Sequence, residues 1–241
     1  MDDLQRMEKY IAAMAAHNVS SLRQANVAGR VHPFITISRE VGAGGHRLAE
    51  SLVRQMQSLK QDGIFSGWQM MDQELCQKIL RNPKLKVSLE SLVREELHSE
   101  IEDVLNNLIA GYTPQEQVIT EIFRTIRTLA TVGKVIVVGR GGVCVTRDLP
   151  YGVHVRLVAP QSVRVLRMME RLHLSANEAR QLVSRTDNSR AKLVKEYFSK
   201  DIRDPLLYDV TWNTDSVSIE EIASSIIGLI TSRVDGAQEV A

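Results

Sequence analysis

The chain has 241 residues, of which 44% are hydrophobic and 24% charged, enough apolar material for a sizeable core in one domain with an appendage. Thirty lysines and arginines against 29 acids leave a net charge of +1, which argues against binding nucleic acid through bulk charge. Only 5% of the residues are aromatic, which argues against a base-stacking surface, and no apolar stretch approaches the roughly 20 residues that cross a bilayer.

The ends of the chain and its cysteines indicate the compartment. Cys76 and Cys144 form no C-x-x-C pair, so we expect two reduced thiols rather than a disulfide framework or a zinc site. The first residues, MDDLQRMEKY, lack the basic segment and long apolar run of a secretory signal. We therefore expect a cytoplasmic protein that binds no membrane.

Residues 4–22 are expected to form an amphipathic helix, because apolar residues recur at steps of three and four. We assign residues 1–30 to an N-terminal helical appendage. Its apolar side is compatible with a homodimer or partner contact and equally with packing back on its own domain. The apolar positions that start the stripe are Leu4, Met7, Ile11 and Met14.

A glycine-rich loop follows the first predicted strand, Phe34–Ser38, and precedes a helical pattern. Strand, glycine loop and helix in this order place backbone N–H groups around an anion. The loop departs from the P-loop pattern G-x-x-x-x-G-K-[ST], because Arg39 stands at the first glycine, Gly45 at the lysine and His46 at the Ser/Thr position. Taken alone, it is equally compatible with a turn that binds nothing.

Further strands are predicted along the chain. A short strand, Trp68–Met71, is followed by Asp72. A helical pattern then runs to about residue 130, with breaks at Asn82-Pro83 and Gly111–Pro114. The clearest strand is Lys134–Val138, which the sequence GRGG follows directly at residues 139–142. The remaining elements are strands at His154–Val158 and Val210–Trp212, and helices at Ser162–Leu172 and Ala176–Phe198, with a capping box from Ser218 to Glu221 before the last helix.

Strands that alternate with helices predict a parallel α/β sheet, and ligands bind such sheets outside the carboxyl ends of the strands. Arg140 follows the clearest strand, and its guanidinium suits phosphate or carboxylate, although a surface arginine in a turn is equally compatible. The region Arg164–Arg190 is rich in arginine. It is compatible with a solvated face and also with a helical lid that brings cations to a moving phosphoryl group.

Four segments carry a family resemblance over about residues 34–230: ISREVGAGGHRLAE, MDQEL, VIVVGRGG and HVRLVAPQSVRVLRMMER…DNSR…DPLLYDVTWNTDSVSIEEI. In this order they resemble the cytidylate kinase-like family, relatives of bacterial cytidylate kinases among the P-loop nucleoside-monophosphate kinases. The resemblance implies a three-layer α/β fold with a parallel sheet at residues 31–235. Within it we expect a helical acceptor-binding insert at about 73–130 and a helical lid at about 168–200.

The resemblance further implies an enzyme that phosphorylates a nucleoside monophosphate, CMP or dCMP first, from ATP with Mg²⁺, and that has nucleotides rather than nucleic acid as partners. No metal ligands from the protein are implied. The residues that would surround the ATP phosphates are Gly42, Ala43, Gly44, Gly45, His46 and Arg47.

The same resemblance assigns the acceptor side and the transferring group. Arg140 matches the arginine of a G-R-D motif that holds the CMP phosphate, with Gly141 in place of the aspartate. Three residues match the lid pattern R-x-D-x-x-R. The expected substrate-binding residues are Asp72, Arg140, Asp187 and Arg190, and the expected catalytic residues are Arg185, Arg190 and Arg39.

Gly45 cannot neutralise phosphate charge as a loop lysine does, so Arg39, His46 or Arg47 would have to substitute for it. Loss of one such cation costs on the order of 10²–10³ in rate by analogy with loss of an oxyanion donor. The alternative is therefore a catalytically impaired nucleotide-binding protein with a regulatory or scaffold role through residues 1–30. A kinase with a non-nucleotide acceptor is a third reading that no residue selects.

Overall fold

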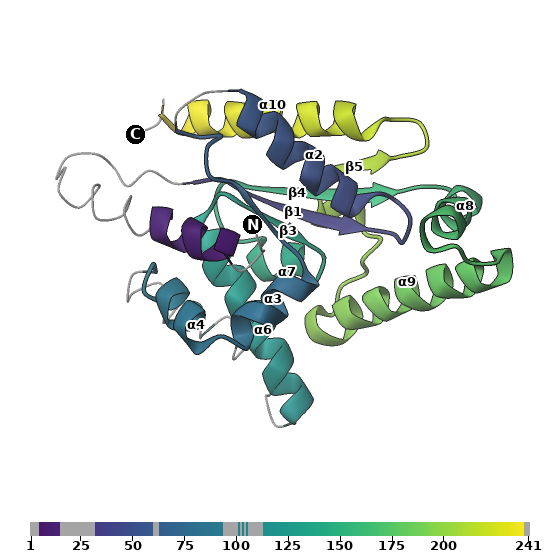
Figure 1. The fold of residues 1–241 in the computed structure, drawn as a ribbon, viewed down its shortest axis with the longest axis horizontal. Helices are drawn as coiled ribbons and strands as arrows, with labels where there is room; N and C mark the ends of the chain where they lie inside the picture. The colour runs from purple at the N-terminus through teal and green to yellow at the C-terminus, as the bar shows by residue number, and fades with distance from the viewer. Residues whose placement is uncertain are drawn as a thin grey trace.

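The computed structural model describes residues 5–14, 32–59, 63–93, 101, 103, 105 and 113–238. At its centre is a five-stranded, entirely parallel sheet with the strand order β2-β3-β1-β4-β5. Because all strands run the same way, their carboxyl ends meet along one edge (Figure 1). The strands are β1 (Phe34–Arg39), β2 (Gln69–Met71), β3 (Val135–Val138), β4 (Gly152–Val158) and β5 (Val210–Asn213).

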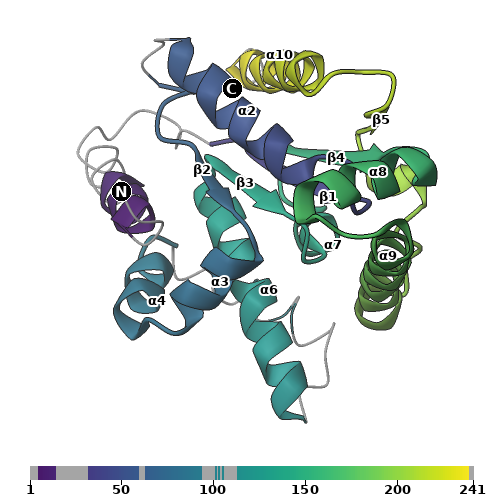
Figure 2. The same cartoon turned by 45° about the vertical axis from the view of Figure 1, so that its right-hand side comes forward.

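Helices cover both faces of the sheet, as the sequence predicts (Figure 1). On one face lie α2 (Gly45–Ser58) and α10 (Ile219–Gln238), which pack against each other. The other face carries α3 (Gln73–Leu80), α4 (Pro83–Glu90), α6 (Pro114–Val132) and the short α7 (Gly142–Thr146). The pair α8 (Gln161–Leu172) and α9 (Ala176–Phe198) lies beside the carboxyl ends of the strands (Figure 2), and the 3-10 turn η1 (Pro205–Leu207) precedes β5.

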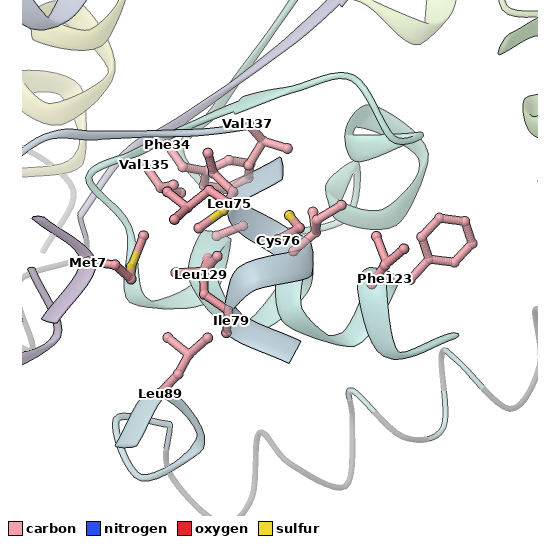
Figure 3. Close-up of a cluster of buried hydrophobic side chains, with 14 of the residues drawn as sticks. Met7, Phe34, Leu75, Cys76, Ile79, Leu89, Phe123, Leu129, Val135 and Val137 are labelled. Atoms are coloured by element: carbon pink, nitrogen blue, oxygen red, sulfur yellow. The ribbon is translucent and has the colours of Figure 1, made fainter. Parts of the chain in front are cut away.

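Alternating strand residues divide the core into two clusters. Ile35 and Ile37 of β1 face α2 and α10 and are buried with Leu48, Leu52 and Ile226. The opposite cluster joins the sheet to α3, α4 and α6, and Figure 3 shows Phe34, Val135 and Val137 of the sheet packed toward Leu75, Cys76 and Ile79 of α3. Fully parallel sheets are covered on both faces in this way, which is why their strands are apolar throughout.

The N-terminal helix is observed over residues 5–14; the rest of the predicted helix lies outside the described residues. Its apolar stripe enters the second core cluster, where Met7, Tyr10, Ile11 and Met14 are buried, and the Tyr10 hydroxyl donates a 2.5 Å hydrogen bond to the carbonyl of Gly133. The described residues of this helix therefore pack back on the chain's own domain, and a homodimer or partner contact through residues 1–30 stays a prediction.

Local capping explains the helix boundaries. Asp72 and Asn82 cap α3 and α4 through their side-chain oxygens, and Thr113 forms a capping box with Glu116 at the start of α6. The breaks predicted at Asn82–Pro83 and before Pro114 thus become helix starts. The predicted capping box between Ser218 and Glu221 is also formed. None of the helices described here is long and apolar enough to cross a membrane.

Candidate active site

The glycine loop joins β1 to α2 at the carboxyl edge of the sheet. Gly42 and Gly44 have φ angles of 80° and 89°, a left-handed conformation that favours glycine. At Gly42 a side chain is also excluded by space, because a Cβ there would lie 2.7 Å from the carbonyl oxygen of Arg164. The loop is therefore held against α8 by close backbone contact.

Most amides of this loop have no acceptor among the described residues. Val41 N–H donates to Asp187 Oδ1 at 2.8 Å, and Ala43 N–H donates to the carbonyl of Glu40 at 3.2 Å. None of the hydrogen bonds between described residues uses the N–H groups of Gly42 or of residues 44–47. The first N–H groups of α2 have no partner within the helix and carry its positive dipole end, so they suit an anion.

A cavity of about 820 Å³, here called the loop cavity, lies over these amides. Its size is within the range of small-molecule sites. Arginines from three other elements complete its wall: Arg39, Arg167, Arg171 and Arg190. All six residues that the sequence assigns to ATP line it: Gly42, Ala43, Gly44, Gly45, His46 and Arg47.

A second cavity of about 200 Å³, here called the turn cavity, lies between the ends of β1 and β3, the turn at residues 139–142, α9 and Tyr208. Arg140 lines it. This residue has a left-handed φ of 55°, uncommon for a residue with a side chain, and its Nε is buried without a hydrogen bond. No described residue forms an ion pair with its guanidinium. Burial lowers the pKa of Arg140.

Arg39 and Arg190 line both cavities. Arg190 donates a 3.0 Å hydrogen bond from Nη1 to the carbonyl of Arg39, which fixes α9 to the end of β1. Burial and the positive charges of Arg190 and Arg140 lower the pKa of Arg39 to about 9. Burial likewise lowers the pKa of Arg190. Three guanidinium groups with lowered pKa values around adjoining cavities favour occupation by anions.

Asp187 connects α9 to the glycine loop. Its Oδ1 accepts from Val41 N–H, its Oδ2 accepts from Arg164 Nη1 at 2.6 Å, and Arg190 Nη1 lies 3.8 Å from Oδ1. Arg164 is also 3.2 Å from Glu40 Oε2 and donates to the carbonyl of Ala159. Asp187 therefore orients Arg190 and holds α9 against the loop. Arg164 stabilises this contact and is not available to bind a ligand.

Two of the predicted residues, Asp72 and Arg185, line neither of the two cavities. Asp72 caps α3, its second oxygen is 3.9 Å from His46 Nδ1, and it lines neither of the two cavities. Arg185 is exposed on α9 and also lines neither cavity. The structure thus brings together the glycine loop, Arg39, Arg140, Asp187 and Arg190, and it does not bring Arg185 to them.

Sequence reasoning missed part of the wall of the turn cavity. Ser38 lines it, and both Arg156 Nη1, at 3.2 Å, and the Tyr208 hydroxyl, at 3.1 Å, lie within hydrogen-bond distance of its hydroxyl. The Tyr208 hydroxyl donates its one proton to the carbonyl of Ile202, 2.8 Å away. Ser38, Arg156 and Tyr208 all lie within the segments that carry the resemblance, but none was given a role. Tyr208 is 170 residues from Ser38, so no local signal joined them. In the described part of the chain, no group of three or more His, Cys, Asp or Glu residues is placed to hold a metal ion.

Comparisons with solved structures agree with this fold. An uncharacterised protein from Eubacterium ventriosum is 21% identical, with 84% of this chain and 99% of that chain covered and a TM-score of 0.63. A shikimate kinase from Acinetobacter baumannii in complex with shikimate is 18% identical over 84% of this chain and 95% of that chain. The TM-score of this second comparison is 0.45.

No curated protein matches the sequence significantly. The first of these structural neighbours shares the fold of this chain, and the parallel five-stranded sheet agrees with the three-layer α/β fold that the resemblance implies. The model of the cytidylate kinase-like family matches residues 34–216, from β1 to the turn after β5. The chain therefore belongs to the cytidylate kinase-like family, a family of the phosphotransferase type.

Proposed function

We propose that the protein transfers the γ-phosphoryl group of ATP to the phosphate of a nucleoside monophosphate, with CMP or dCMP as the first candidates. The single observation that carries this proposal is the arrangement of two cavities that share Arg39 and Arg190. A phosphoryl transfer enzyme needs a donor site, an acceptor site and cations where they meet.

The loop cavity fits the donor. The amides of residues 44–47 supply N–H groups that have no acceptor in the part of the chain that the structure describes, and the volume of the cavity suits a nucleotide rather than a single ion. Mg²⁺ would accompany ATP and would neutralise part of the charge of its phosphates. The chain's own part is to hold the polyphosphate on the loop and to keep its terminal group beside Arg39 and Arg190.

The turn cavity fits the phosphate of the acceptor. Arg140 offers a guanidinium without a partner among the described residues, and the hydroxyl of Ser189 lines the same cavity. The acceptor's own phosphate oxygen attacks the γ-phosphorus, the bond to the β-γ bridging oxygen breaks, and ADP leaves. The protein positions the groups and neutralises charge, and no covalent intermediate with the chain is involved.

The replacement of the loop lysine by Gly45 favours one competing function, nucleotide binding without turnover. An assay of ADP release separates the two. ATP–Mg²⁺ is offered with CMP, dCMP, UMP and AMP in turn, beside the variants Arg190→Met and, as a matched control, Arg180→Met on the exposed side of α9.

We expect turnover with at least one acceptor, most rapidly with CMP or dCMP. It should fall by about 10²–10³ in Arg190→Met and persist in Arg180→Met. Turnover in neither the parent protein nor the control, together with calorimetric binding of ATP, would establish the nucleotide-binding function instead. Equal turnover in Arg190→Met would remove Arg190 from the transfer step and contradict the role of the shared arginines.

A further inference from the structure

The position of the missing loop lysine is filled by another residue. A Cβ built on Gly45 would lie 2.8 Å from Cγ and 3.0 Å from Cδ of Arg39. Gly45 does not have a left-handed φ, so its backbone accepts any residue. The absence of a side chain at residue 45 is therefore required by the stem of Arg39 and not by the turn.

The far end of the same side chain passes over a second glycine. A Cβ on Gly139 would overlap Nη1 of Arg39 and lie 2.9 Å from its Cζ. The guanidinium of Arg39 thus reaches from the loop to the turn that carries Arg140. A lysine at residue 45 would start on α2, whereas this cation starts on β1 and crosses the boundary between the two cavities.

The guanidinium of Arg39 has no counter-ion among the described residues. No described residue makes a hydrogen bond or ion pair with its guanidinium, although its backbone carbonyl accepts from Arg190. The positive charges of Arg190 and Arg140 lower the pKa of Arg39, and the negative charges of Asp72 and Asp187 raise it. A half-buried guanidinium without a partner is costly unless an anion occupies the site.

We propose that Arg39 and Gly45 are an exchanged pair, in which the arginine at the end of β1 supplies the cation that P-loop kinases carry at the loop lysine. Gly45 and Gly139 are glycines because a side chain at either position would displace it. The proposal rests on the proposed function for the identity of the bound phosphates. It goes beyond that function because it predicts how residues 39 and 45 depend on each other.

The exchange predicts a reversal of sign between two backgrounds. In the parent protein a lysine at residue 45 clashes with Arg39, so Gly45→Lys weakens binding of phosphates. Once Arg39→Ala has emptied the space, the same lysine restores an ordinary P-loop cation and strengthens binding. A purely structural role for Arg39 predicts no such reversal, since the added lysine would not replace a packing contact.

The test measures calorimetric affinity for inorganic tripolyphosphate, which needs neither an acceptor nor turnover. Five variants are compared with the parent: Arg39→Met, Arg39→Ala, Gly45→Lys, Arg39→Ala with Gly45→Lys, and Arg180→Met as the control. Arg39→Met keeps most of the alkyl stem against Gly45 and removes only the charge. Thermal unfolding checks that each variant is folded, and Gly45→Ala in both backgrounds replaces the lysine series if Gly45→Lys is not.

We expect the affinity to fall about 10- to 100-fold in Arg39→Met and Arg39→Ala, as for loss of a charged hydrogen-bonding group. The double variant should recover to within about threefold of the parent, while Gly45→Lys alone should lose at least tenfold. In the alanine series, Gly45→Ala should weaken binding beside Arg39 and be neutral in Arg39→Ala. Affinity in Arg39→Met equal to that of Arg180→Met, or a double variant no tighter than Arg39→Ala, would overturn the exchange.

The outcomes also separate this inference from the proposed function. The predicted reversal without turnover on any nucleoside monophosphate would leave the exchange standing and remove the proposed function. Turnover that is insensitive to Arg39→Met would leave the proposed function standing and remove the exchange.

Discussion

Two groups of arginines lie at the carboxyl edge of the sheet, and they differ in their partners. On α8, Arg164 is paired with Glu40 and Asp187, and Arg167 donates to the carbonyl and hydroxyl of Thr214. At the rim of the turn cavity, Arg39 and Arg140 have no side-chain partner among the described residues. The difference distinguishes arginines that stabilise the fold from arginines whose guanidinium groups are available to bind a ligand. The sequence alone does not distinguish the two groups.

The free-energy cost of burying an unpaired charge explains why this difference between the two groups of arginines is informative. A guanidinium removed from water without a partner is unfavourable, and the lowered pKa values of Arg39 and Arg140 reflect that cost. A fold tolerates such groups mainly where an anion relieves them. Paired arginines need no such relief, because carboxylates and carbonyls from the same chain already satisfy them.

Among the arginines compared here, we expect substitution of Arg164 to have the largest effect on stability. We expect Arg164→Ala to lower the free energy of unfolding by about 2–3 kcal/mol, because Glu40 and Asp187 lose the cation that neutralises them in a partly buried site. Urea denaturation measures the change, with the exposed Arg180→Ala expected to stay within about 0.5 kcal/mol of the parent. A loss below 1 kcal/mol in Arg164→Ala would remove this arginine from the structural group.

At Arg140 the opposite result is expected. Arg140→Ala should weaken binding of the acceptor that gives turnover by about 10- to 100-fold and leave ATP binding largely intact. The free energy of unfolding should be unchanged or slightly higher, because the variant removes a buried Nε without a partner. Calorimetric titration of each substrate and urea denaturation give the three values, and equal loss of both substrates, or of neither, would contradict the assignment.

The sequence was sufficient for the sheet and for much of the rim. Short β-branched runs such as that of β3 predicted the strands to within about two residues, because buried parallel strands must be apolar on both faces. Helix α7 was missed, since its five residues, GVCVT, are too few to show a helical period. Residues next to strand ends, such as Arg140, were found because parallel topology alone places them at one edge.

Residues on helices could not be ranked in the same way. Arg185 and Arg190 are five positions apart, about 140° around a helix, and the sequence did not say which of the two faces the sheet. The structure leaves Arg185 exposed and places Arg190 on both cavities. The clamp between Asp187 and Val41, and the contact between Tyr208 and Ser38, join residues 146 and 170 positions apart, which no local pattern reports.

The smallest expected effect concerns His46. Like Arg39, it lines the loop cavity, but it is uncharged without a ligand. Burial and the charge of Arg39 lower its pKa below the ordinary 6.5, against the opposing attraction of Asp72, so His46 is neutral at pH 7. A bound polyanion favours the protonated ring, so binding takes up a proton and the affinity contribution of His46 rises as the pH falls.

Between pH 8 and pH 6 we therefore expect the parent protein to gain about two- to threefold in affinity for tripolyphosphate relative to His46→Asn. The variant corrects for protonation of the tripolyphosphate itself, since both proteins meet the same ligand at each pH. Calorimetry in two buffers of different ionisation enthalpy counts the protons taken up at constant ionic strength. Identical pH profiles for the two proteins would place His46 beside the anion as a neutral donor only, and the cations at the site would then be arginines alone.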